Sequence, residues 1–147
     1  MGFQILAVDP AVALGAVDQS DIVLVVADSD RGYPCRATLE DARKGERLYL
    51  IPYAHQPAGT HRSSGPIYLR EGAQPVRLQP NHVPEMLSSR LLSLRAYGLD
   101  HGLRDADVVD GLEVGSAIES ILRDPEISYL HVHNAKPGCF ACRVERA

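Results

Sequence analysis

Short apolar or alternating segments recur along this chain, and few helical segments separate them. Strand-like patterns occur at residues 22–27, 48–55, 66–70, 92–97 and 106–109. Parallel neighbours need a crossover, usually a helix, between consecutive strands, so a chain with more strands than helices favours antiparallel or mixed pairing. We therefore predict an α+β fold with a mixed or mostly antiparallel sheet and a few helices on one face.

Two of the strand-like segments carry further information. The run at residues 22–27 is apolar throughout and rich in β-branched side chains, the pattern of a strand buried on both faces. The run at 48–55 contains Pro52, whose nitrogen cannot donate a ladder hydrogen bond, which indicates an edge strand or a bend. The polar segment at 38–46 is expected to form a short helix or a loop.

The clearest predicted helix follows Asp110. Its apolar residues fit the spacing of one buried helical stripe: Val114, Ala117, Ile118, Ile121 and Leu122. Asp110 can cap the N-terminus, with Glu113 in the position of a capping-box partner, and Asp124-Pro125 ends the helix. A second, short helix is expected to begin at Pro84.

The C-terminal segment predicts a β-hairpin. Residues 129–134 alternate, Lys136-Pro137-Gly138 supplies a turn, and residues 140–145 alternate again.

Length and composition restrict the classes of function. A chain of 147 residues suits one domain over residues 1–147. The net charge of -4 argues against nucleic acid or a membrane surface as partner. No apolar run approaches the ~20 residues that span a bilayer, and the N-terminus lacks a secretory signal pattern. Three cysteines are an odd number and argue against a fully paired disulfide framework, so we expect a cytoplasmic protein.

The densest set of reactive side chains lies in the predicted hairpin. His131 and His133 share one face of a strand, roughly 7 Å apart along it. Cys139 and Cys142 have the Cys-x-x-Cys spacing that can chelate zinc if the segment turns between them. The four side chains form a candidate Cys₂His₂ zinc site. Strict alternation argues against it, because it puts the two thiols on opposite faces and Cys142 beside Phe140, as a small core residue.

The hypothesis that we favour, with the zinc site as its alternative, is a metal-free site for a small anionic ligand, with or without catalysis. A histidine would carry the proton, and an arginine would hold a carboxylate or phosphate. A partly buried arginine needs an anionic partner, which the chain itself or a ligand could supply. The candidate residues are His131, His133, Asn134 and His55, with Arg36, Arg95, Arg143 and Ser64 as ligand-binding groups.

A further hypothesis is an interaction module without chemistry. Exposed strand edges carrying Tyr49, Tyr53 and Tyr68 would suit a homodimer.

Several segments resemble the bacterial domain-of-unknown-function family DUF1203. The resemblance rests on Tyr33-Pro34-Cys35-Arg36, Ser64-Gly65-Pro66-Ile67, Leu92 to Tyr97, Asp105 to Gly111, His131-Val132-His133-Asn134-Ala135 and Cys139-Phe140-Ala141-Cys142-Arg143. It implies a single-domain bacterial protein and supplies no activity or catalytic residue. The match is weakest over residues 1–20, as is common at a domain terminus.

Overall fold

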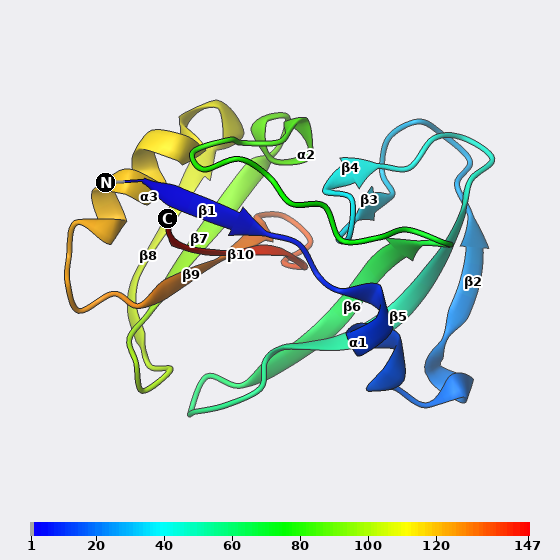
Figure 1. The fold of residues 1–147 in the computed structure, drawn as a ribbon, viewed down its shortest axis with the longest axis horizontal. Coiled ribbons are helices and arrows are strands. Elements are labelled where there is room, and N and C mark those ends of the chain that lie inside the picture. Colours follow the sequence, from blue (N-terminus) through cyan, green and yellow to red (C-terminus); the bar gives the residue numbers. More distant parts are fainter. Residues whose placement is uncertain (1) are drawn as a thin grey trace.

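The chain folds into two five-stranded sheets that face each other, as Figure 1 shows for the computed structural model, which describes residues 2–147. The first sheet has the order β1-β10-β9-β7-β8 and the second the order β2-β5-β6-β3-β4. The first comprises β1 (Phe3–Leu6), β7 (Leu91–Tyr97), β8 (Leu103–Asp110), β9 (Tyr129–Asn134) and β10 (Phe140–Arg146). The second comprises β2 (Val23–Val26), β3 (Pro34–Cys35), β4 (Glu40–Asp41), β5 (Arg47–Gln56) and β6 (Ser63–Arg70).

Strand pairing is antiparallel throughout the first sheet and mixed in the second, where β3 runs parallel to β6. The antiparallel pair β9–β10 is the expected C-terminal hairpin. The predicted α+β fold with mostly antiparallel pairing is therefore confirmed. The structure adds a division into two sheets.

In the part of the chain that the structure describes, three α-helices accompany the sheets: α1 (Pro10–Gly15), α2 (Glu85–Ser88) and α3 (Val114–Leu122). Single 3₁₀ turns lie at Gln19–Asp21 and Gly111–Glu113. α2 and α3 pack on one face of the first sheet, where Leu87 and Ile118 join a buried cluster with Leu94 and Val132. Within residues 2–147, no helix is long and apolar enough to cross a membrane.

The start of α3 follows the predicted capping signal in part. The Asp110 carboxylate accepts a hydrogen bond of 2.9 Å from the backbone nitrogen of Leu112, which opens the 3₁₀ turn before the helix. Glu113 makes no side-chain cap hydrogen bond. The turn lies tightly against α2, because a side chain at Gly111 would collide with the carbonyl of Leu87.

The prediction that residues 22–27 form a strand buried on both faces is wrong in its burial. β2 is an edge strand, and Val23 and Val26 are 52% and 58% exposed. Among the described strands it pairs only with β5, and three of its four side chains are exposed. A continuous apolar run reflects the β propensity of its residues, and it does not show which faces of the strand are covered by other parts of the protein.

Tyr49 and Tyr68 pair with neighbouring strands on both sides, whereas Tyr53 lies past Leu50, where β5 pairs with β6 alone. They belong to β5 and β6, interior strands of the second sheet, and each is half-buried. Pro52 of β5 lies past Leu50, the last residue that pairs with β2, so its missing N–H is not needed for a ladder on that side. Residues 38–46 form turns around the short β4.

The space between the sheets is filled by a second apolar cluster. Ile51 and Ile67 of the second sheet pack there with Phe140 of the first. The side chains described next lie beside this cluster, at the same interface.

Candidate metal centre

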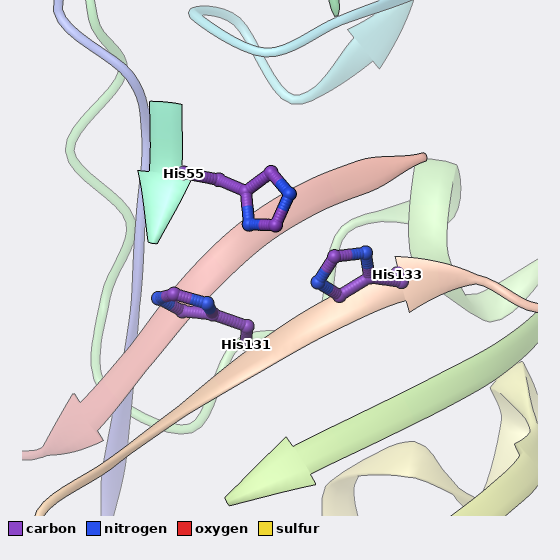
Figure 2. A group of neighbouring side chains, drawn as sticks. All are labelled: His55, His131 and His133. Atoms are coloured by element: carbon purple, nitrogen blue, oxygen red, sulfur yellow. The ribbon is translucent and has the colours of Figure 1, made fainter. Parts of the chain in front are cut away.

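Three histidines converge between the sheets (Figure 2). His131 and His133 come from β9, and His55 comes from the end of β5 in the opposite sheet. One ring nitrogen from each lies within 4.8 Å of the other two. The predicted placement of His131 and His133 on one face is confirmed, and His55 joins them from a distant part of the sequence.

The alternation of β9 explains why two of these side chains face the second sheet. Leu130 and Val132 belong to the apolar cluster beneath α3, so His131 and His133 must point the other way. On β5, a register shift between Tyr53 and Gln56 accompanies the turn of His55 into the same space.

Phe140 packs against all three imidazole rings. Its ring lies 5.3 Å from that of His55 in a near-parallel stack, and 5.2 and 5.7 Å from the rings of His131 and His133, edge to face. A bulge in β10 makes this possible. Phe140 pairs with His133 while Cys142 pairs with Val132, so the two β10 residues face opposite sides of the sheet.

Each of the three rings presents one buried nitrogen without a hydrogen-bond partner in the described chain. These atoms are Nδ1 of His55, Nδ1 of His131 and Nε2 of His133. The other nitrogen of His133, Nδ1, lies 2.9 Å from the carbonyl oxygen of Gly138 and must donate to it. That hydrogen bond fixes the tautomer and leaves Nε2 with a free lone pair, as in histidines that bind metals.

Burial keeps these histidines neutral. Desolvation, reinforced by His133 and His55, lowers the pKa of His131 to about 3. Desolvation also lowers the pKa of His133 to about 4 against the opposing effect of the Gly138 hydrogen bond. The pKa of His55 is lowered by burial and by the charge of Arg95. All three rings therefore offer lone pairs at neutral pH.

A pocket of about 840 Å³ adjoins the cluster, with walls from both sheets. Several of the predicted site residues line it: Arg36, His55, Ser64, Arg95, Asn134 and Cys139. His55 is the histidine of the cluster that reaches the pocket wall. Arg143 is not among the lining residues; its guanidinium lies 4.0 Å from the ring centroid of Tyr129 and pairs with Glu145 at 2.7 Å.

Arg36 is the largest fully buried side chain, at 1% exposure. Its Nε donates to the carbonyl of Phe140 at 2.8 Å, and its Nη1 donates to the carbonyl of Pro34 at 2.5 Å. Burial lowers its pKa, and within residues 2–147 it has no carboxylate partner.

The family described as "Protein of unknown function (DUF1203)" matches residues 32–146. The chain belongs to this family. The match contains the three histidines, Phe140 and Arg36, whereas β1, α1 and β2 precede it. No curated protein and no solved structure matches the chain.

The structure separates the members of the Cys₂His₂ set considered from the sequence. Cys142 lies in the apolar cluster beneath the helices, where burial raises the pKa of its thiol to about 12. Cys139 lies at the hairpin turn, and its sulfur accepts a 3.3 Å hydrogen bond from the side chain of Asn134. The three cysteines of the chain are free. The predicted alternation of β10 is wrong at this point, because the bulge sends Phe140 and Cys142 to different faces.

Two features of the site had no signal in the sequence. The alternating pattern of residues 140–145 predicts Phe140 as an ordinary strand residue and gives no sign of its contact with the three histidines. The carbonyl of Gly138 orients His133 through a turn geometry that no side-chain pattern reveals. His61, which flanks the loop after β5, lies apart from the cluster, where its Nδ1 accepts a weak hydrogen bond from Leu103.

Proposed function

We propose that this protein binds a divalent transition-metal ion through His55, His131 and His133, with zinc the best chemical match. The observation that carries the proposal is the set of three buried ring nitrogens, one from each histidine, that have no hydrogen-bond partner within residues 2–147. Leaving one buried polar atom unpaired costs about 1–3 kcal/mol. Metal coordination would satisfy all three.

The spacing of the ring nitrogens is close to what zinc requires. Zn–N bonds of about 2.0–2.1 Å in a tetrahedral site put the ligand nitrogens roughly 3.4 Å apart. The largest separation here is 4.8 Å or less. Ring rotations that bring the nitrogens to this spacing would close the site around an ion.

The type of coordinating side chain limits which metal ions the site can bind. Neutral imidazole suits zinc, copper, nickel and iron, whereas calcium and magnesium prefer carboxylate and carbonyl oxygens. The described cluster contains histidines alone. Three protein ligands also leave a coordination position for water or another ligand, which is the arrangement of catalytic zinc sites, whereas structural sites use four.

The alternative of a histidine general acid or base has weaker support. Such a group works best with a pKa near the operating pH. Burial holds the pKa of His131 at about 3 and that of His133 at about 4, well below neutrality.

Metal analysis of untagged protein purified without chelator tests the proposal. We expect about one zinc per chain by elemental mass spectrometry, and saturable zinc binding by the EDTA-stripped protein in calorimetry. His55→Ala should lose at least about tenfold in zinc affinity. The control is His61→Ala, since His61 is exposed and lies outside the cluster.

Two results would overturn the metal proposal. One is a folded wild-type protein that takes up no zinc, cobalt, nickel or copper. The other is stoichiometric binding that His55→Ala and His61→Ala leave equally intact, because the ion would then lie elsewhere.

A further inference from the structure

The pocket beside the histidine cluster is positively charged, although the chain as a whole carries a net charge of -4. Four basic residues line it: Arg36, Arg90, Arg95 and Lys136. Among the described residues that line it there is no aspartate or glutamate. A concave site with one sign of charge and apolar walls concentrates ions of the opposite sign.

Not all of these charges are available to a ligand. Arg90 is paired with Asp41 at 2.7 Å. Lys136 lies exposed in the hairpin turn, where water screens its charge. Arg36 and Arg95 are different, because within residues 2–147 neither makes an ion pair with a carboxylate.

The burial of Arg36 demands an explanation. A buried guanidinium is costly unless it has a counter-charge and its five donors are satisfied. Two of those donors go to the carbonyls of Phe140 and Pro34, which are neutral acceptors. Arg36 also lines the pocket, as does Cys139, whose side chain favours the charged form of Arg36. An anion in the pocket would supply the missing counter-charge.

Arg95 connects the pocket to the histidine cluster. It pairs across the sheet with His131, since β7 and β9 are neighbours. It also lines the same pocket as His55. An anion held by Arg95 would therefore lie beside the metal site.

The other residues that line the pocket indicate that the uncharged part of the ligand is apolar. Leu50, Pro66, Tyr68, Leu91 and Phe140 give the walls an apolar character. The volume of about 840 Å³ is within the range of pockets that enclose small organic molecules, about 300–1,000 Å³. A bare inorganic ion would leave most of this space and most of this apolar surface unused.

We infer that the pocket binds a small organic oxyanion, a phosphate or a carboxylate, whose charged head lies against Arg36 and Arg95 beside the metal site. The inference rests on the proposed metal function, because it assigns the ligand that would meet the open coordination position of the ion. The apolar body of the ligand occupies the wider part of the pocket.

Calorimetric titration with matched probes tests the inference. Phenyl phosphate and benzoate share an apolar ring and differ in the charged head, benzyl alcohol keeps the ring without the charge, and inorganic phosphate keeps the charge without the ring. Each is titrated into zinc-loaded and into EDTA-stripped protein. The variants are Arg95→Gln and Arg36→Lys, with Arg123→Gln as control, because Arg123 is exposed at the end of α3.

We expect at least one of the two ring anions to bind saturably, with benzyl alcohol not binding and inorganic phosphate binding more weakly. Arg95→Gln should weaken that binding at least about tenfold, as expected for the loss of a charge-assisted hydrogen bond. Arg123→Gln should leave it unchanged. Arg36→Lys keeps the charge but loses the planar fork, so it should also weaken binding. If only phenyl phosphate binds, the charged head of the ligand is a phosphate. If only benzoate binds, it is a carboxylate.

The inference fails if neither ring anion binds more tightly than about 1 mM to either form of the protein. It also fails if Arg95→Gln and Arg36→Lys both bind as well as the wild type. The two proposals separate cleanly. Zinc uptake without anion binding would support the metal site and contradict the inference of an anion pocket. Anion binding that depends on Arg95, in a protein that binds no metal, would support the anion pocket and contradict the proposed metal function.

Discussion

The ring of His55 stacks on the ring of Phe140, with centroids 5.3 Å apart and planes 5° from parallel. The two residues belong to different sheets, since His55 ends β5 and Phe140 begins β10. The same phenylalanine touches His131 and His133 edge to face. The apolar contact that joins the sheets therefore also sets the orientation of all three imidazoles.

Replacing Phe140 by leucine should weaken zinc binding more than it weakens folding. Leucine keeps an apolar side chain at the sheet interface, so the free energy of unfolding should fall by only about 1–2 kcal/mol. The flat surface that orients His55 is lost, and zinc affinity should fall about tenfold. Urea unfolding and calorimetric zinc titration measure the two effects.

Phe3→Leu is the matched control for this change. Phe3 is 2% exposed and lies in the other apolar cluster, away from the histidines. Its replacement should cost similar stability and leave zinc affinity unchanged. Equal loss of zinc affinity in both variants would mean that Phe140 acts through general stability alone.

The turn at Gly138 should determine which ring nitrogen of His133 is free to bind a metal ion. Gly138 has a φ of +79°, which disfavours any side chain, and its carbonyl holds Nδ1 of His133. Gly138→Ala should cost about 1–2 kcal/mol of stability through backbone strain. By shifting the carbonyl it should also reduce zinc affinity about tenfold, which calorimetry would detect.

Gly45 offers a matched backbone control. Its φ is +91°, and like Gly138 it has open space where a side chain would go. Gly45→Ala should show the same loss of stability with no change in zinc affinity. If both alanine variants bind zinc like the wild type, the Gly138 carbonyl has no part in orienting His133.

The metal-free protein should lose stability in mild acid. His131 and His133 have pKa values lowered to about 3 and about 4, against about 6.5 in an unfolded chain. Below pH 6.5 the unfolded state binds protons that the folded state does not bind. This contribution to the free energy of unfolding is therefore fully present above pH 6.5 and falls as the pH drops toward the pKa values of the folded state. Arg95, Arg143 and His55 face His131 and oppose its protonation.

Urea unfolding of EDTA-treated protein at pH 7 and pH 5 measures this effect. Each buried histidine contributes up to roughly 2 kcal/mol between these two pH values, or about 3–4 kcal/mol for the pair. A His131→Gln/His133→Gln double variant should lose most of the pH dependence. A wild-type protein that is equally stable at both pH values would mean that both rings titrate freely in the folded state.

The sequence predicted the elements whose side-chain pattern is local. The stripe from Val114 to Leu122 lies on α3, and the alternation of residues 129–134 turns His131 and His133 to one face of β9. Both patterns follow from the period of a single helix or strand, so no knowledge of distant residues is needed.

What the sequence could not predict depends on contacts between distant segments. His55 joins the cluster because the two sheets face each other, and no local period encodes that packing. The bulge that separates Phe140 from Cys142 adds one residue to β10 and reverses the predicted faces beyond it. The exposure of β2 likewise follows from its place at the edge of the second sheet, since the same apolar run would suit a central strand.

Removing the thiol of Cys142 should leave zinc binding intact. The side chain of Cys142 is fully buried on the opposite face of the sheet from the histidines, and burial keeps its thiol protonated. Cys142→Ala removes one heavy atom from the core, so it should cost only about 1 kcal/mol of stability. Zinc affinity, measured by calorimetry on EDTA-stripped protein, should match the wild type, whereas His133→Ala in the same assay should lose at least about tenfold. A strong loss of zinc affinity in Cys142→Ala, with the fold retained by circular dichroism, would instead favour a cysteine-containing site and a rearranged hairpin, because only unwinding of the bulge at Phe140 could bring that sulfur round to the histidine face.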